Sequence, residues 1–465
     1  MSALWTSDEI VAATGGALQG ERFAATGVSI DTRTLEPGDL FVALEGVRDG
    51  HEFVGEAMRK GAAGALIARA VEGVPAVLAP DTLRALQALG LAARDRAPNC
   101  RRAAVTGSVG KTSTTQAIAA ALALAGPAHA SVKSYNNHIG VPLTLARMPP
   151  GTERAVFEIG MNHAGEIAAL SPMVRPHAAL VTTVGPVHVE NFADGETGVA
   201  HAKAEIFEGL QPGGRAILNA DNRWLGLLRD AAKARGADIF TFGREGRQAR
   251  LLAFKPNAEG ALVEAELHGR RARFPIAQSA AHWGEMSLAV LLTAEALGVP
   301  LEVGMTALAS FAPLEGRGRE YRIPLARGEL LLIDESYNAN PISMRSAFAT
   351  LGARPVQGRR IAVLTDMLEL GPEGPAMHAA LAEPIAAAKL DLVFTAGPLM
   401  RSLHEALPPE RRGGWAESAA ELAPRVTAQV RPGDAVVVKG SNGSKAALVA
   451  DALRAMQPVE PGARV

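Results

Sequence analysis

One segment of the chain combines glycines, a lysine and hydroxyl side chains in the order used by phosphate-binding loops: Thr106-Gly-Ser-Val-Gly-Lys-Thr-Ser113. Glycines let backbone amides approach phosphate oxygens, and the N-terminus of a following helix adds positive potential. In such a loop Lys111 reaches the β- and γ-phosphates, and the Thr112 hydroxyl binds Mg²⁺. The first glycine of the full pattern is replaced by Val105. We predict nucleotide-phosphate binding by Gly107, Ser108, Val109, Gly110, Lys111, Thr112 and Ser113; the alternative is a tight strand-to-helix turn with an exposed lysine.

Three later residues could supply a metal site beside this loop. Glu158 lies in the apolar segment 155–159, and His188 follows the apolar segment 178–184. Parallel strands deliver such residues to the carboxyl edge of a sheet, where ligands bind, and Mg²⁺ prefers oxygen donors that it shares with phosphates. Taken alone, His188 is more simply a hydrogen-bonded histidine, and Lys203 an ordinary helix lysine.

Three further polar segments are candidates for nucleotide contacts. Asp334-Glu-Ser-Tyr-Asn-Ala-Asn-Pro341 follows the apolar segment 330–333 and suits recognition of a base and a ribose, or is a polar loop. Gly316-Arg-Gly-Arg319 offers guanidinium groups to phosphates, or is a flexible basic linker. Lys439-Gly-Ser-Asn-Gly-Ser444 is a second glycine-rich loop, or a structural turn.

The polar residues near the N-terminus indicate a loop-rich edge that could hold a ligand. They form the segments Ser29-Ile-Asp-Thr-Arg33, Pro37-Gly-Asp-Leu-Phe41 and Asp49-Gly-His51. Their spacing alone specifies no particular ligand.

The elements that must position these residues alternate between short apolar strands and helical patterns. Strands are expected at 28–30, 40–44, 64–68, 76–79, 103–105, 155–159, 178–184, 216–218, 239–242, 330–333, 361–364, 392–395 and 435–438, with helices at 52–60, 82–96, from 111 and at 282–297. Such alternation predicts an α/β protein with mainly parallel sheets. Residues 251–276 alternate differently and predict an antiparallel hairpin. Breaks at Pro98 and Pro313 divide the chain into domains 1–98, 99–312 and 313–465, the last of them Rossmann-like.

Composition limits the class of protein. The 465 residues carry 47 basic and 48 acidic side chains, so binding to nucleic acid through a basic surface is not expected. The single cysteine, Cys100, excludes an intramolecular disulfide framework. The N-terminus lacks the pattern of a signal peptide, and the longest apolar run, 117–125, is about half of what a bilayer crossing needs. We therefore expect a cytoplasmic protein without membrane insertion.

Together these motifs resemble the Mur ligase family of bacterial peptidoglycan synthesis over nearly the whole chain. Besides the phosphate loop, the resemblance rests on Tyr135-Asn-Asn-His-Ile-Gly-Val-Pro142, Glu158-Ile-Gly-Met-Asn-His-Ala-Gly-Glu166 and Asp334-Glu-Ser-Tyr-Asn-Ala-Asn-Pro-Ile-Ser-Met344. The last string is similar to that of the branch whose substrates are UDP-N-acetylmuramoyl-tripeptide and D-alanyl-D-alanine. The sister branch that completes the tripeptide typically has an Asp-Tyr-Ala-His-Thr-Pro string instead.

The resemblance implies three domains: one for the UDP-sugar, a central ATPase and a C-terminal Rossmann-like domain. It implies that Lys111, Glu158, His188 and Lys203 serve catalysis with ATP and two Mg²⁺ ions, with Thr112 and Glu158 on one ion. His188 and Lys203 would hold the other, Lys203 as a CO₂-derived carbamate. The remaining implied contacts are Arg317, Asp334, Tyr337 and Asn338 with the nucleotide, Ser29, Asp31 and Arg33 with the UDP moiety, and Asn136 and Asn137 with the muramoyl-peptide.

Two positions depart from the family pattern. Met286 stands where relatives usually carry an asparagine that contacts adenine, and Asn442 stands where many have arginine. The implied reaction passes through an acyl phosphate, with Gly316 and Gly318 as possible hinge residues for domain closure, and a monomer is expected. The alternatives are folylpolyglutamate synthesis, the tripeptide-forming reaction, or a P-loop regulatory switch. The sequence does not distinguish diaminopimelate from lysine in the tripeptide.

Overall fold

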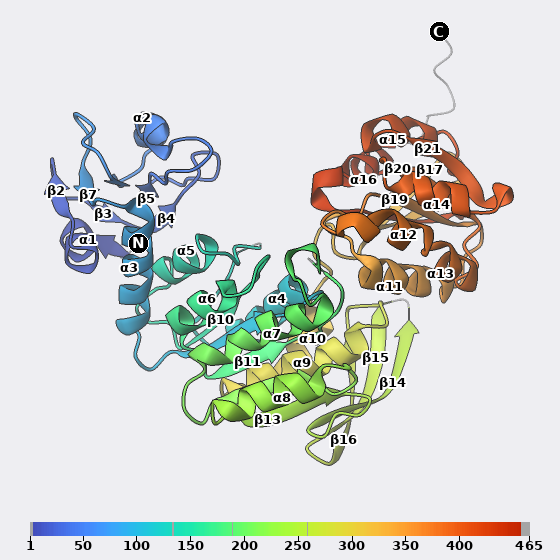
Figure 1. The fold of residues 1–465 in the computed structure, drawn as a ribbon, viewed down its shortest axis with the longest axis horizontal. Helices are drawn as coiled ribbons and strands as arrows, with labels where there is room; N and C mark the ends of the chain where they lie inside the picture. Colours follow the sequence, from blue (N-terminus) through green and yellow to red (C-terminus); the bar gives the residue numbers. More distant parts are fainter. Residues whose placement is uncertain (1–2, 133, 188, 258, 457–465) are drawn as a thin grey trace, which may run out of the picture.

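The computed structural model describes residues 3–132, 134–187, 189–257 and 259–456. The chain folds into three lobes in sequence order, with the N-terminal lobe and the C-terminal lobe at opposite ends of a larger middle lobe (Figure 1). Each lobe contains its own main sheet, of five, nine and six strands in turn. No helix in the described part of the chain is long and apolar enough to cross a membrane.

The N-terminal lobe contains a small sheet with strand order β2-β7-β6-β5-β4. Its strands β4 to β7 are mutually parallel, and β2 joins β7 antiparallel. A separate two-stranded pair, β1 with β3, lies beside it. The bounds are β1 Trp5–Thr6, α1 Ser7–Thr14, β2 Ala17–Gln19, β3 Ala24–Ala25, β4 Gly27–Ser29, β5 Asp39–Val42, η1 Gly50–Phe53, α2 Val54–Arg59, β6 Gly64–Ile67, β7 Ala76–Leu78 and α3 Thr82–Asp95.

Helix α3 connects the first lobe to the second and packs against α5 (Gly140–Ala146) of the middle lobe. One apolar core cluster contains Leu86 and Leu89 of α3 together with Leu143 and Ala146 of α5, all fully buried. The Trp5 indole donates a hydrogen bond to the Ala146 carbonyl at 2.8 Å. A shared apolar core makes these two lobes one packed unit.

The middle lobe is built on a nine-stranded sheet with order β16-β15-β14-β13-β12-β11-β8-β10-β9. The strands from β14 to β9 pair in parallel, whereas β14, β15 and β16 form an antiparallel extension. The strands are β8 Arg101–Thr106, β9 Ala128–Ala130, β10 Arg154–Glu158, β11 Ala178–Val181, β12 Arg215–Asn219, β13 Asp238–Gly243, β14 Ala249–Asn257, β15 Gly260–Leu267 and β16 Arg270–Ile276.

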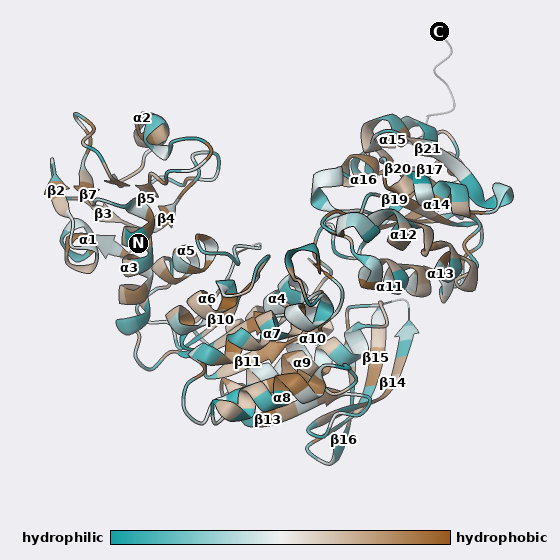
Figure 2. Cartoon of the chain, in the orientation of Figure 1, coloured by the Kyte–Doolittle hydropathy of each residue, from teal (hydrophilic) through white to brown (hydrophobic). Residues whose placement is uncertain are grey.

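Helices cover both faces of this sheet, and two apolar clusters fill the two layers. Helix α9 is buried over most of its surface, in keeping with its brown colour in Figure 2. The helices are α4 Lys111–Leu124, α5, α6 Glu166–Val174, η2 Val189–Asn191, α7 Glu196–Ala204, η3 Glu205–Gly209, α8 Leu225–Ala234, α9 Trp283–Ala296 and α10 Leu301–Ser310.

The C-terminal lobe contains a six-stranded sheet with order β17-β18-β22-β19-β20-β21. All neighbours are parallel except the edge pair β17 and β18. The elements are β17 Arg319–Leu325, β18 Gly328–Glu335, α11 Pro341–Gly352, β19 Arg360–Thr365, η4 Gly371–Glu373, α12 Gly374–Ala379, α13 Ala382–Ala387, β20 Leu392–Ala396, α14 Met400–Ala406, η5 Pro409–Arg411, β21 Arg412–Ala416, α15 Ala419–Thr427, β22 Ala435–Lys439, η6 Asn442–Ser444 and α16 Ala447–Arg454.

The predicted α/β class and the antiparallel hairpin are confirmed, and every expected strand is present within a few residues. The four parallel strands expected after residue 313 are β18, β19, β20 and β22, and they are neighbours in the sheet. The proposed domain limits at 98 and 312 fall in the segments between α3 and β8 and between α10 and β17.

We predict that Gly90 is required for the packing of α3 on α5. A Cβ added at Gly90 would lie 2.9 Å from the Pro142 carbonyl oxygen, whereas one added at Gly226 on α8 meets nothing within 4 Å. Gly90→Ala should therefore lower the free energy of unfolding by about 1–3 kcal/mol, although alanine favours a helix. Gly226→Ala, the matched control, should raise it by about 0.5–1 kcal/mol. Urea unfolding of both variants checks the pair, and equal stabilisation by both would contradict the close packing.

Candidate functional site

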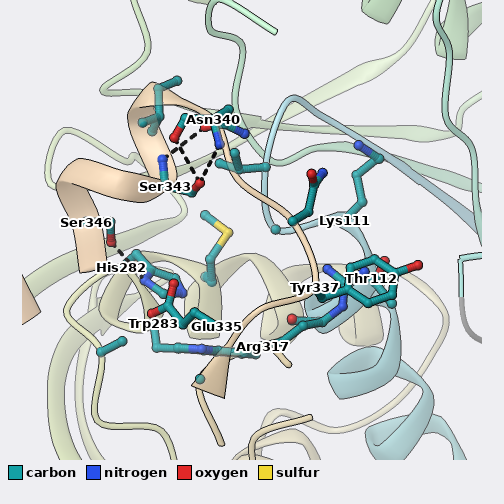
Figure 3. Close-up of a pocket in the computed structure, with 18 of the residues that line it drawn as sticks. Lys111, Thr112, His282, Trp283, Arg317, Glu335, Tyr337, Asn340, Ser343 and Ser346 are labelled. Carbon is teal, nitrogen blue, oxygen red and sulfur yellow. Dashed lines mark hydrogen bonds between the residues drawn. The ribbon is translucent and has the colours of Figure 1, made fainter. Parts of the chain in front are cut away.

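A cavity of about 510 Å³ lies between the middle and C-terminal lobes. Its walls come from the phosphate loop, the ends of β10, β11 and β12, the start of α9, and the residues around β18 and α11. These walls meet at the carboxyl edges of both parallel sheets, which is where open α/β sheets bind ligands. Figure 3 shows Lys111 and Thr112 on one side and Arg317 and Tyr337 next to them.

The predicted phosphate loop is a tight connection from β8 to α4. Gly107 has φ +150°, and a Cβ there would lie 1.9 Å from the Thr182 hydroxyl, so only glycine fits. The Lys111 ammonium donates to the Gly107 carbonyl at 2.8 Å and thereby lies across the loop. Burial lowers the pKa of Lys111, an effect opposed by the nearby Glu158 carboxylate. The loop therefore has the backbone and the cation that a phosphate group requires.

Ser134 connects the phosphate loop to the C-terminal lobe. Its hydroxyl oxygen accepts hydrogen bonds from the Arg317 guanidinium at 3.1 Å and from the Tyr337 hydroxyl at 3.0 Å. It also lies 3.1 Å from the Thr112 hydroxyl. Since a serine oxygen has only two lone pairs, we infer that Ser134 donates its own proton to Thr112. That donation leaves a second lone pair on Thr112 for another partner.

Glu158 is a buried carboxylate at the end of β10, with 1% of its surface exposed. Its Oε1 accepts a hydrogen bond from the Asn136 amide at 2.7 Å, whereas its Oε2 is buried without a partner. A buried unpaired carboxylate oxygen is unfavourable without a cation. The Oε2 atom and the free lone pair of Thr112 are hard oxygen donors of the kind that Mg²⁺ prefers.

Lys203, on α7, is 2% exposed and does not line the cavity itself. Burial holds the pKa of Lys203 well below its ordinary value, and the positive charge of Lys111 lowers it further. His188 lies outside the described residues. Among the residues that are described, no three His, Cys, Asp or Glu side chains cluster in a way that could hold a metal ion.

Arg317 and Tyr337 act as a stacked pair at the phosphate end of the cavity. The guanidinium carbon lies 3.9 Å from the centre of the Tyr337 ring. Burial lowers the pKa of Arg317, and the charge of Glu158 opposes this effect. Gly316 and Gly318, with φ +67° and +94°, flank the arginine. The C-terminal lobe thus presents a partly desolvated cation toward the phosphate loop.

In the polar string at the end of β18, some side chains line the cavity and others stabilise the loop itself. Tyr337 and Asn338 line the cavity, but Asp334 does not. The Asp334 carboxylate is buried and accepts hydrogen bonds from the amide and hydroxyl of Ser336. Asn340 caps α11 together with Ser343, as the dashed lines in Figure 3 show. Asp334 therefore shapes the turn that carries Tyr337.

Most of the residues predicted to bind the muramoyl substrate lie away from this cavity. Asp31 and Arg33 form a bidentate ion pair in the N-terminal lobe, and this pairing lowers the pKa of Asp31 to about 2. The Ser29 hydroxyl bonds the Asp31 carbonyl. Asn137 caps α5 through the amide of Gly140, whereas Asn136 lies in the cavity on Glu158.

For most other cavity residues the sequence predicts no individual role. The sequence offers one indication for Ser134, because this residue directly precedes the motif that begins with Tyr135. Lys439 and Glu335 form a buried ion pair at 2.8 Å, which requires two strands that are distant in the sequence. Arg354 and Glu320, an ion pair within the C-terminal lobe, both bond the Ser279 hydroxyl of the middle lobe. His282 lies 3.3 Å from the Ser346 hydroxyl at the far end. Met286, noted as a departure from the pattern, lines the cavity.

Comparisons with known proteins identify the family. Residues 105–294 match the Mur ligase middle domain, and residues 319–442 match the Mur ligase, glutamate ligase domain. The chain is 37% identical to the UDP-N-acetylmuramoyl-tripeptide–D-alanyl-D-alanine ligase of Escherichia coli, covering 82% of this chain and 83% of that one. It is 30% identical to the ligase of the same name from Rickettsia prowazekii, covering 91% and 94%.

Solved structures give the same result. A crystal structure of MurF from Acinetobacter baumannii superposes with a TM-score of 0.84 at 28% identity, covering 97% of this chain and 98% of that one. The likeness extends over all three lobes and confirms the three-lobed α/β architecture expected from the sequence. With a phosphate loop facing Arg317 of the C-terminal lobe, and with relatives matched over most of their length, this chain belongs to the Mur ligase family.

Proposed function

We propose that this protein is an ATP-dependent ligase that joins D-alanyl-D-alanine to UDP-N-acetylmuramoyl-tripeptide. The observation that carries the proposal is the cavity in which Lys111 and Thr112 of the phosphate loop face Arg317 and Tyr337 of the C-terminal lobe. Relatives that bear this activity in their names match the chain over most of both lengths. The product is the pentapeptide precursor of peptidoglycan.

The first chemical step transfers a phosphoryl group. The terminal carboxylate of the tripeptide attacks the γ-phosphorus of ATP, the bond to the bridging oxygen breaks, and ADP leaves. Lys111, Arg317 and the loop amides bind the charged phosphoryl oxygens during this transfer. Thr112 and the unpaired Oε2 of Glu158 would hold Mg²⁺, which supplies charge neutralisation to the phosphates when bound.

The second step forms the amide. The free amine of D-alanyl-D-alanine attacks the carbonyl carbon of the acyl phosphate, and the tetrahedral intermediate collapses with release of phosphate. Water would compete for the acyl phosphate, so the site must exclude it. The contacts of Arg317 and Tyr337 with Ser134 bring the C-terminal lobe onto the phosphate loop and cover this part of the cavity.

Lys203 is proposed to carry a carbamate. A carbamate forms when a neutral amine adds CO₂, and burial of Lys203 favours the neutral form by lowering its pKa. The product is an anionic oxygen ligand of the type that Mg²⁺ accepts. His188, outside the described residues, and this carbamate are proposed to serve a second Mg²⁺.

The remaining substrate contacts stay predictions from the sequence. Ser29, Asp31 and Arg33 lie together in the N-terminal lobe as the proposed UDP contacts. Asn136 and Asn137 begin the segment that leads into α5, as the proposed muramoyl-peptide contacts. A cytoplasmic location and a monomeric state are likewise predictions.

The reaction is tested by phosphate release with ATP and Mg²⁺. Release should require both UDP-N-acetylmuramoyl-tripeptide and D-alanyl-D-alanine, and mass spectrometry should show the tripeptide heavier by one dipeptide residue. Addition of EDTA should abolish release, because the proposed oxygen ligands need Mg²⁺ between them and the phosphates. Turnover with folate and glutamate, or with a single amino acid as acceptor, would contradict the proposal.

Lys111→Met should lower kcat/KM for ATP by about 10²–10³-fold, because it removes a half-buried charged donor to the transferring phosphoryl group. The matched control is Lys233→Met on the exposed face of α8, which should keep wild-type kinetics. Steady-state phosphate release on both variants makes the comparison. Equal kinetics in Lys111→Met and Lys233→Met would remove Lys111 from the mechanism.

The carbamate has a readout independent of activity. Protein equilibrated with ¹³C-bicarbonate should show a carbamate carbon resonance by NMR that disappears on acidification. Lys203→Arg should lack the signal, because a guanidinium does not form it. A spectrum of the wild-type protein identical to that of Lys203→Arg would show that Lys203 is unmodified.

A further inference from the structure

We propose that Lys439 is a positioning residue that holds the loop 336–340 in the conformation in which Tyr337 reaches the phosphate loop. The Lys439 ammonium donates hydrogen bonds to Glu335 and Asn338, and not to Ser134 or the phosphate loop. It therefore acts on Tyr337 through these two residues. The expected effect on nucleotide binding and kinetics rests on the proposed function. The expected effect on the loop conformation rests on the geometry alone.

The strand register brings the two charged groups together. Strands β18 and β22 are parallel neighbours, and Glu335 pairs with Lys439 as the last pair of the ladder. Their side chains are 15% and 5% exposed, and the ammonium lies 2.8 Å from the Glu335 carboxylate. This pair ends β18 at the residue from which the loop departs.

The same ammonium also donates to the Asn338 carbonyl at 3.1 Å. One cation therefore connects the end of β22, the end of β18 and the middle of the loop. The loop is held at further points: the Tyr337 amide donates to the Gly316 carbonyl, and Asn340 caps α11. Between these points the Asn338 carbonyl is held by Lys439, and the next carbonyl, that of Ala339, accepts a longer hydrogen bond of 3.4 Å from the Ser441 hydroxyl.

A buried ion pair is weak evidence for stability, since apolar side chains of the same volume often stabilise as well. The bond to Asn338 is different, because no apolar residue can replace a donor to a loop carbonyl. The position of Lys439 in the wall of the cavity agrees with a role in shaping the site. By holding the backbone at Asn338, Lys439 thus positions the neighbouring Tyr337, on which Arg317 stacks.

The first measurement is amide hydrogen exchange across residues 336–340 in the full chain without substrates. Lys439→Met should increase exchange in this segment, while Lys445→Met, an exposed lysine of the neighbouring loop, should not. Lys439→Met leaves the Glu335 carboxylate buried without its partner, which can itself destabilise the fold. The double variant Lys439→Met/Glu335→Leu removes that carboxylate and so separates the two effects. It should recover the melting temperature without recovering protection of the loop.

The second measurement is binding of a non-hydrolysable ATP analogue by calorimetry, with steady-state kinetics alongside. Lys439→Met and the double variant should both raise Kd for the analogue about tenfold, the size expected for one lost charge-assisted hydrogen bond. KM for D-alanyl-D-alanine should stay within about twofold of the wild-type value. A twofold change corresponds to a much smaller free energy than the loss of one hydrogen bond.

Unchanged loop exchange in Lys439→Met would overturn the positioning role. Recovery of both protection and affinity in the double variant would also overturn it, by showing that only charge burial matters. Absence of ligase turnover in the wild-type protein would instead refute the proposed function, and the exchange comparison would remain valid.

Discussion

The hydroxyl of Ser134 is the point at which the two halves of the site meet. It accepts from Arg317 and Tyr337 of the C-terminal lobe and lies against Thr112 of the phosphate loop. A loop that binds phosphate can be built within one parallel sheet, but a cation facing it must come from another element. The hydrogen bonds at Ser134 hold Arg317 close enough to the phosphate loop for the charge of Glu158 to act on it. A phosphate group in the loop would therefore meet two positive charges, that of Lys111 from the middle lobe and that of Arg317 from the C-terminal lobe.

The two lobe interfaces differ in physical character. The N-terminal lobe shares an apolar cluster with the middle lobe through α3 and α5. In the described part of the chain, no apolar core cluster joins the middle and C-terminal sheets. Hydrogen bonds between polar side chains cross that contact, among them Arg354 with Ser279 and Ser346 with His282. Polar interfaces of this kind separate at lower cost than apolar ones. From this difference we predict that the C-terminal lobe, and not the N-terminal lobe, moves relative to the middle lobe when substrates exchange.

Much of the fold could be predicted because buried parallel strands are short apolar runs bounded by turn residues. Among the strands that escaped prediction, β17 and β21 have other compositions. Strand β17 contains two arginines, a glutamate and Pro324 and lies at a sheet edge, and β21 begins with an arginine and two glycines. Neither pattern alternates in a way that distinguishes a strand from a loop.

The phosphate loop could be predicted because its residues are contiguous in the sequence. Ser134 and the Lys439–Glu335 pair could not, because their roles arise only when separate strands and lobes come together. Asp334 shows the reverse case: its motif suggested a ligand contact, and the structure places its carboxylate on Ser336, where it forms the turn. A polar residue in a motif can therefore serve the ligand indirectly, by fixing the loop that presents its neighbour.

The central claim is that the C-terminal lobe completes the nucleotide site through Arg317. The most direct measurement is calorimetric binding of a non-hydrolysable ATP analogue to Arg317→Met, beside Arg319→Met as the matched control. Arg319 is exposed and lies over Tyr321, away from the cavity. The account predicts that Arg317→Met raises Kd by about 10–100-fold, as expected for loss of a partly buried charged donor, and that Arg319→Met leaves Kd unchanged. Wild-type affinity in Arg317→Met would contradict it.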